Sequence, residues 1–154
     1  MAKKESTTTK VNIGKELNKQ VANGNVLYVK LHNYHWYVKG PNFFTLHVKF
    51  EELYNEVTEM MDEIAERMLA IGEKPSATMK EYMELATIKE AQGGEDPTEM
   101  VQNIADDYRA MAKDFLELAE AAEEEGDMPT SDMLIGMVEK LQKHIWMLDS
   151  YAGK

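Results

Sequence analysis

The stretch FFTLHVKFEELYNEVTEMMDEIAERMLAI, residues 43–71, is the most informative segment of this chain. Its apolar residues recur every three or four positions, which is the period of an α-helix. Together they form one narrow stripe: Phe43, Leu46, Phe50, Leu53, Val57, Met60, Ile64, Met68 and Ile71. Because a helix with one apolar stripe must bury that stripe against other elements, the stretch predicts one helix of a bundle.

The opposite face of this helix carries residue types that bind metal ions. At about 100° per residue, His47, Glu51, Asp62 and Glu66 fall on an arc roughly 100° wide, centred about 150° from the apolar stripe. At a rise of about 1.5 Å per residue, His47 and Asp62 lie about 22 Å apart, too far to share one ion. Two copies of the helix, antiparallel about a twofold axis near its middle, would bring the two ends together. The spacing therefore predicts a site shared between two subunits.

His35 adds a second imidazole, 12 residues before His47. Imidazoles and carboxylates together are ligand types that suit iron. However, the helix has seven acidic residues between positions 51 and 66, so acidic pairs one turn apart would also arise on an ordinary solvated face. Judged from these residues alone, the metal site and the charged surface both remain open interpretations.

The whole chain shows four long helical patterns and no strand pattern. The patterns cover approximately 11–38, 43–72, 96–126 and 129 onward. Gly40-Pro41-Asn42 separates the first two, with Asn42 as the expected cap of the second. The start of the third helix is predicted at Asp96-Pro97-Thr98-Glu99. Asp96 is the expected N-cap, Pro97 takes the first helical position, and Glu99 is the capping glutamate.

The connection between Glu73 and Glu95 is too long for a simple loop. Its middle, Met79 to Ala91, has a helical pattern, so we expect a short crossover helix between helices two and three. The fold class is therefore predicted to be all-α, a four-helix bundle with one crossover helix.

Composition predicts one domain over residues 11–154, preceded by a mobile tail, residues 1–10, that has no helical pattern. The absence of cysteine excludes disulfides and thiolate metal ligands. No segment approaches the ~20 apolar residues of a membrane span, and no apolar signal-peptide core follows the N-terminal lysines. We therefore expect a cytoplasmic protein.

Several motifs resemble the signature of the Dps family, the miniferritins or DNA-binding proteins from starved cells of the ferritin-like superfamily. The run LHNYHWYVKGPNFFTLH covers residues 31–47, and DEIAER covers 62–67. The similarity continues in DMLI at 132–135 and KHIWM at 143–147. It extends over nearly the whole chain apart from the first ten residues.

The resemblance implies a ferritin-like bundle that assembles as a hollow homododecamer with iron sites at the twofold interfaces. It implies ferroxidase activity, in which Fe(II) is oxidised by hydrogen peroxide or oxygen, with hydrogen peroxide preferred, and ferric mineral is stored. Iron would be the metal cofactor, and protection against oxidative stress the result. The family's catalytic and metal-binding positions fall on His35, His47, Glu51, Asp62 and Glu66. Glu51, where many members have Asp, would bind iron directly or through water.

Other residues lie near the five implied ligands. Trp36 sits beside His35, where it would either intercept stray oxidising equivalents or pack in a subunit interface. His32, one turn before His35, would support the ligands from behind or serve as a structural histidine. His144 is interpreted as a hydrogen-bonded structural histidine. Asp127 and Asp132 resemble the region that lines the family's threefold pores.

The net charge of −11 opposes binding of duplex DNA. The first ten residues offer only Lys3, Lys4 and Lys10 against Glu5, so we expect weak or no DNA binding. The same acidity would concentrate Fe(II) at openings of the shell. Two alternatives to a ferroxidase stay open: a nucleoid protein whose main role is to bind and shield DNA, and an acidic helical oligomer that binds no metal.

Overall fold

The computed structural model describes residues 9–154, and over that range its regular elements are all helices, joined by loops. The helices follow one another along the chain as α1 (Ile13–Tyr37), α2 (Phe43–Ala70), α3 (Met79–Leu85), α4 (Pro97–Glu124) and α5 (Met128–Tyr151). The predicted all-α fold with a short crossover helix is confirmed. Residues 1–8 lie outside the described residues, and most of the predicted mobile tail lies there. The boundary between tail and domain stays a prediction.

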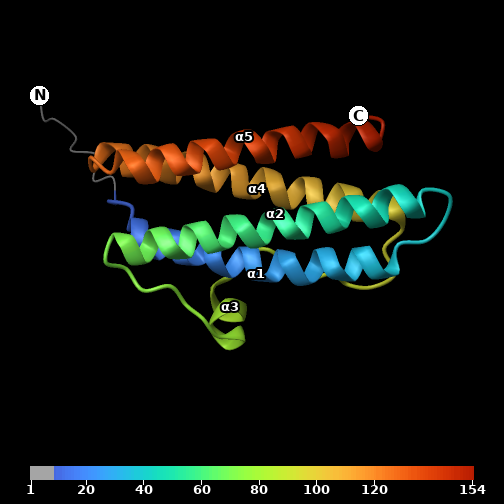
Figure 1. The fold of residues 1–154 in the computed structure, drawn as a ribbon, viewed down its shortest axis with the longest axis horizontal. Coiled ribbons are helices and arrows are strands. Elements are labelled where there is room, and N and C mark those ends of the chain that lie inside the picture. Colours follow the sequence, from blue (N-terminus) through green and yellow to red (C-terminus); the bar gives the residue numbers. More distant parts are fainter. Residues whose placement is uncertain (1–8) are drawn as a thin grey trace, which may run out of the picture.

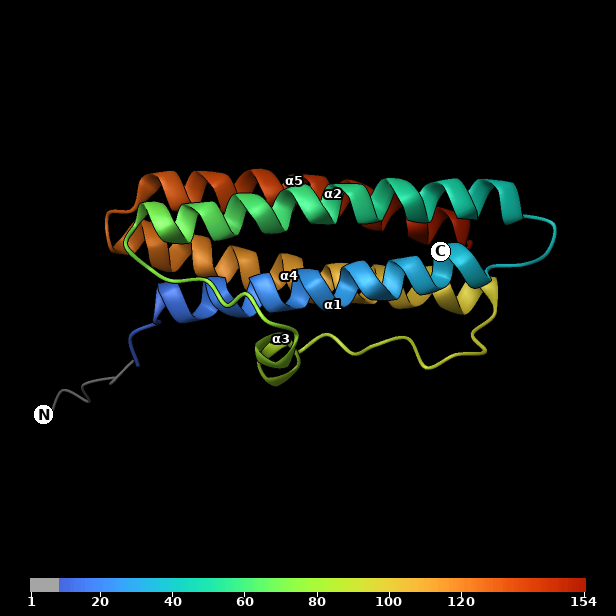
Figure 2. The same ribbon diagram turned by 60° about the horizontal axis from the view of Figure 1, so that its bottom comes forward.

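The four long helices form two antiparallel hairpins that lie side by side (Figure 1). The loop 38–42 joins α1 to α2, and residues 125–127 join α4 to α5. The connection from α2 to α4 runs along the length of the bundle and places α3 beside α1 (Figure 2). As a result, α2 and α4 begin at the same end of the bundle and point in the same direction.

The core lies between the hairpins and is filled by the predicted apolar stripes. In α2 the stripe is buried from Leu46 to Met68, and its end members Phe43 and Ile71 are partly buried. The stripe of α4 is buried throughout, at Val101, Ile104, Tyr108, Met111, Phe115, Leu118 and Ala122. None of the helices found in residues 9–154 combines the length and the apolar character needed to cross a membrane.

Local signals set several helix boundaries. Asp96 and Glu99 form the predicted capping box, each side chain accepting a hydrogen bond from the backbone N–H of the other residue. Asn12 caps α1 by accepting from the N–H of Lys15 at 3.0 Å. Asn42 takes the predicted N-cap position of α2, but its side chain makes no capping hydrogen bond. Its backbone, at φ −100° and ψ 16°, lies outside the extended region usual for an N-cap residue.

The crossover helix predicted over 79–91 is shorter than expected and ends at Leu85. Asn23 of α1 is almost fully buried, and its Oδ1 accepts from the backbone N–H groups of Thr87, at 2.7 Å, and Ile88, at 3.1 Å. These N–H groups are therefore bonded to α1 and do not continue the helical ladder of α3. The long-range contact ends α3 and pins the crossover connection to the bundle.

Replacing Asn23 with Ala should destabilise the fold, because the N–H groups of Thr87 and Ile88 lose their acceptor. We expect the free energy of unfolding to fall by about 1–3 kcal/mol. Asn25→Ala is the matched control, since the Asn25 side chain donates to the Val21 carbonyl of its own helix. Urea denaturation measures both variants, and an Asn23→Ala protein no less stable than the control would contradict the pinning role.

Candidate metal centre

Two histidines meet at the end of the first hairpin. His35 lies in the last turn of α1 and His47 near the start of α2, and the loop 38–42 folds one helix back onto the other. The two rings stack with centroids 3.7 Å apart and planes inclined by 15°. Nδ1 of His35 lies 2.6 Å from the carbonyl oxygen of His47, and Nδ1 of His47 lies 2.7 Å from the carbonyl oxygen of His35. The reciprocal bonds join the two helices at this end.

The reciprocal bonding determines which ring nitrogen of each histidine is free. A carbonyl oxygen only accepts hydrogen bonds, so each Nδ1 must carry the hydrogen and donate it. The neutral ring then keeps its lone pair on Nε2, which is the ring nitrogen available to a metal ion. A carbonyl that holds the other N–H is a common way for proteins to orient a metal-binding imidazole. The two reciprocal bonds therefore leave Nε2 of His35 and of His47 as candidate metal ligands.

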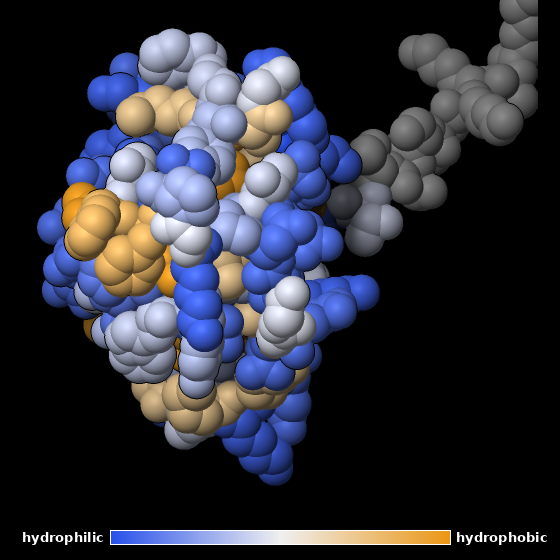
Figure 3. All heavy atoms as spheres, turned by 90° about the vertical axis from the view of Figure 1, so that its right-hand side faces the viewer, coloured by the Kyte–Doolittle hydropathy of each residue, from blue (hydrophilic) through white to orange (hydrophobic). Residues whose placement is uncertain are grey.

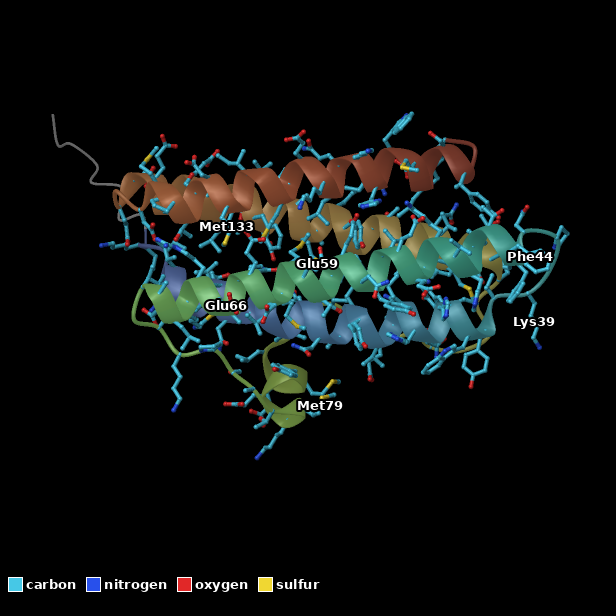
Figure 4. The ribbon with its side chains drawn as sticks, in the orientation of Figure 1. Lys39, Phe44, Glu59, Glu66, Met79 and Met133 are labelled. Atoms are coloured by element: carbon cyan, nitrogen blue, oxygen red, sulfur yellow. The ribbon has the colours of Figure 1, made fainter. Side chains whose placement is uncertain are left out.

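The three carboxylates of the predicted site lie on the exposed side of α2, as the helical period predicts. Glu51 is the nearest of them in sequence to the histidine pair, whereas Asp62 and Glu66 lie in the second half of the helix. Figure 4 shows this separation, with Phe44 at the start of α2 and Glu66 towards its other end. Among residues 9–154 of one chain, no three His, Asp or Glu side chains come close enough to hold a metal ion. One chain brings the two histidines together and leaves Asp62 and Glu66 apart from them.

Aromatic rings surround the histidine pair. Trp36 is 66% exposed. His32 donates its Nδ1–H to the carbonyl oxygen of Tyr28 at 2.9 Å. The His32 ring lies 6.5 Å from the ring of His35 and 5.2 Å from that of Trp36, edge to face in both cases. His32 is thus fixed by its own helix and flanks the histidine pair through its ring contact with His35.

Two side-chain contacts between α2 and α5 hold the helices of the two hairpins together. Arg67, the last residue of DEIAER, donates from Nη2 to Asp127 at 2.8 Å and from Nε to the hydroxyl of Thr130 at 2.9 Å. His144 is buried, and its Nε2 contacts the carboxylate of Glu56. His144 is therefore the hydrogen-bonded structural histidine that we expected. The role of Arg67 was not apparent from the sequence, since nothing local to it indicates a partner 60 residues away.

The two aspartates assigned to a pore have different surroundings. Asp127 is the N-cap of α5 and accepts from the backbone N–H and the hydroxyl of Thr130, besides Arg67. Partial burial acts to raise the pKa of Asp127, but the hydrogen bonds from Thr130 and Arg67 outweigh it and hold this pKa below the usual carboxyl value. Asp132 is exposed on the first turns of α5. The negative charge of Asp127 is thus already paired, whereas Asp132 faces solvent.

Comparison with known sequences agrees with this architecture. A family model described as a ferritin-like domain matches residues 14–154. General stress protein 20U of Bacillus subtilis is 54% identical over 137 residues, which cover 89% of this chain and 94% of that protein. DNA protection during starvation protein 2 of Bacillus anthracis is 56% identical over 138 residues, which cover 90% of this chain and 94% of that protein.

Solved structures extend the similarity to three dimensions. Dps from Staphylococcus aureus matches with a TM-score of 0.89 at 50% identity, over 91% of this chain and 94% of that one. Dps from Listeria monocytogenes matches with a TM-score of 0.92 at 41% identity, over 96% of this chain and 97% of that one. The bundle and its crossover helix thus define the ferritin-like class of fold. Within that class, the chain belongs to the Dps family.

Asp127→Asn should lower the midpoint of thermal unfolding at neutral pH, and the loss should shrink in acid. Because the pKa of Asp127 is lowered in the folded state, its ionised form stabilises the fold above the ordinary value of 3.8. This contribution is lost as the pH falls through the lower folded-state pKa. Asparagine still caps a helix, so the change isolates the charge that faces Arg67. Thermal melts of both proteins from neutral to acidic pH measure the gap.

Asp132→Asn is the control for this measurement, since Asp132 is an exposed carboxylate on the same helix. We expect its effect on the melting midpoint to be small at every pH. An equal loss in both variants, or a loss in Asp127→Asn that persists in strong acid, would contradict the charge pairing with Arg67.

Proposed function

We propose that this chain is a ferroxidase and iron-storage subunit of a hollow homododecamer, which oxidises Fe(II) and stores ferric mineral. The main support for the proposal is the reciprocal hydrogen bonding of His35 and His47, which keeps Nε2 of each ring available to a metal ion. Membership of the Dps family and the match to a ferritin-like domain support iron as the metal. Fe(II) is the substrate, and protection against oxidative stress is the result.

Each site takes its ligands from two subunits. His35, His47 and Glu51 come from one subunit, and the partner subunit's Asp62 and Glu66 come from an α2 that runs antiparallel to the first. The period of α2 supports this arrangement, because all four α2 ligands lie on the side opposite the core. The separation of about 22 Å within one helix supports it as well, since a twofold axis near the middle of α2 converts that separation into proximity.

The ligand set explains why iron is oxidised at the site and not reduced. Carboxylates are hard oxygen donors and stabilise Fe(III) more than Fe(II), so the site favours loss of an electron once an oxidant is present. The neutral imidazoles retain affinity for the divalent ion. Hydrogen peroxide accepts one electron from each of two Fe(II) ions and leaves as two hydroxides, so Fe(II) and peroxide are consumed together without releasing a radical. We take peroxide as the preferred oxidant, with oxygen as the alternative.

The acidity of the chain supports the proposal that Fe(II) enters the shell through negatively charged openings. The net charge of −11 per chain attracts divalent cations. We propose that Asp132 and Asp127 line a pore near the start of α5. Asp127 contributes less to the attraction of cations, because its charge is paired with that of Arg67. Trp36 and His32 are proposed to flank the ligands on the side of α1.

Mixed assemblies test the shared site. A His47→Ala chain and an Asp62→Ala chain should each be inactive alone, because every site lacks a ligand. In a heterodimer of the two, one site receives both defects and the other receives neither, so we expect roughly half of the wild-type activity per heterodimer. The measurement is the initial rate of Fe(II) oxidation by peroxide after the two variants are unfolded and coassembled.

A second mixture provides the matched control. His35→Ala and His47→Ala remove ligands that come from the same subunit of a site, so their heterodimer has one defect in each site and should show no recovery. If the first mixture stays as inactive as its parents despite proven subunit mixing, or if the control mixture recovers equally, the intersubunit site is wrong.

A DNA-shielding role is the second candidate, because several relatives carry the name DNA protection during starvation protein. The charge of this chain opposes it, and Lys10, one of the few basic tail residues, pairs with Glu125 at 3.2 Å. Lys3 and Lys4 lie outside the described residues. We therefore propose that DNA binding is weak or absent.

Electrophoretic shift assays over a salt series should show no stable complex with duplex DNA near about 150 mM salt, where exposed charges are screened beyond roughly 8 Å. The control is the same protein without residues 1–10. Retarded DNA at this salt concentration that disappears on removal of the tail would favour the nucleoid function instead.

A further inference from the structure

A cleft of about 500 Å³ lies under the connection that leads from α3 to α4. This strap, residues 86–96, runs along the bundle to the start of α4 (Figure 2). The walls of the cleft come from three parts of the chain: α1 supplies Lys30 and Tyr34, α4 supplies Asn103 and Asp107, and the strap covers them. The volume falls within the range of about 300–1,000 Å³ that is usual for sites of small molecules.

The floor of the cleft is built from buried polar groups that have partners. Nζ of Lys30 donates to Asp107 at 2.7 Å, and the side-chain amide of Asn103 donates to the hydroxyl of Tyr34 at 3.0 Å. Lys30 is 7% exposed, and Tyr34 is fully buried. Because these contacts join α1 directly to α4, the floor does not depend on the strap for its shape.

Glu95 of the strap is the lining residue whose hydrogen bonding is incomplete. Its Oε1 accepts from the backbone N–H groups of Gln92, at 2.9 Å, and Gly93, at 2.7 Å. Its Oε2 is buried, and no group within residues 9–154 donates a hydrogen bond to it. Burial raises the pKa of Tyr34 to about 12, and the nearby charge of Glu95 adds to this rise. A buried acceptor without a donor is unfavourable, so Oε2 marks the place where a ligand would donate.

The strap can open over this acceptor, because hydrogen bonds tie its two ends to the bundle. Near one end, the backbone N–H groups of Thr87 and Ile88 are bonded to α1. At the other end, Asp96 is the N-cap of α4. The hydrogen bonds from the N–H groups of Gln92 and Gly93 stay within the strap. Residues 89–95 therefore form a short cover between two fixed ends, and an outward movement of this cover would expose Oε2.

The charges of the cleft favour a cation. The lining carries five carboxylates and two ammonium groups, and the negative field that results attracts positive charge. A bare metal ion fits poorly, because no three His, Asp or Glu side chains of residues 9–154 come close enough to hold one. An organic ammonium ion fits better, since its N–H groups donate charge-assisted hydrogen bonds to a carboxylate. A second ammonium group on the same molecule would meet Glu90 and Asp106, two exposed carboxylates of the lining.

We propose that the cleft under the strap binds a linear aliphatic polyamine, of which a diamine is the smallest, with one ammonium group donating to Oε2 of Glu95. The strap closes over the bound amine, and Glu90 and Asp106 hold its other end. The site uses none of the five proposed metal ligands, so it goes beyond the proposed ferroxidase function. Amines bound in this way would neutralise part of the negative charge of the chain.

Isothermal titration calorimetry of assembled, iron-free protein with putrescine, a short linear diamine, tests the site. We expect saturable binding of one putrescine per chain. Glu95→Gln should weaken binding by about tenfold or more, because the amide keeps an acceptor for Gln92 and Gly93 but places N–H donors where Oε2 was. Glu120→Gln removes an exposed carboxylate of α4 outside the cleft. It is the matched control and should bind putrescine as the wild type does.

Hydrogen exchange of the wild-type protein locates the amine without a variant. Putrescine should slow the exchange of the N–H groups of residues 89–95 and leave that of α5 unchanged. Equal affinity of Glu95→Gln and the wild type, protection outside the strap alone, or no saturable binding would overturn the site. Saturable binding of magnesium chloride that Glu95→Gln abolishes would also overturn the proposal, because the cleft would then be a site for a divalent metal ion.

Discussion

The rigidity of α2 is the constraint on which the site depends. A helix fixes both the angle and the distance between its side chains, so the stripe that fills the core also determines which residues face outward. His47 and Glu51 stand at one end of that outward face, and Asp62 and Glu66 at the other. No change of side-chain conformation closes a gap of about 22 Å. A second copy of the chain is the simplest way to complete the ligand set, which makes assembly a condition of activity in the proposed function.

In the proposed function, the hairpin of α1 and α2 orients the two histidines of the site without a partner. His35 and His47 bond to the carbonyl oxygen of each other's residue, so the same contacts close the end of the hairpin and orient both rings. The same end of the bundle, where α2 begins and α5 ends, carries apolar side chains at its surface, among them Phe44 and Val48 (Figure 3). The hairpin thus combines a pre-oriented pair of candidate ligands with exposed surface of the kind that subunits bury.

Features that depend on neighbours in sequence could be predicted, and those that depend on distant partners could not. The stripe of α2 and the capping box of Asp96 and Glu99 follow from local spacing, and both are confirmed. The end of α3 depends on Asn23, 64 residues before Thr87, so the helical pattern alone extended α3 too far. The outward face shared by the four candidate ligands on α2 follows from the period of the helix. The reciprocal bonding of the two histidines required the fold, since no spacing rule shows which atoms face each other.

In the proposed function, not every carboxylate contributes equally to the attraction of Fe(II), because some carboxylates are paired with cations. A formal count treats every carboxylate as a source of attraction for Fe(II), yet a carboxylate bonded to a cation contributes little field beyond its partner. Asp127 is such a group, because its carboxylate accepts hydrogen bonds from Arg67 and Thr130. These bonds hold α2 against the start of α5. Asp132 lies on the next turn, and its side chain is exposed to solvent. Of these two aspartates, Asp132 is therefore the one free to attract cations in the proposed function, whereas Asp127 maintains the packing of α2 against the start of α5.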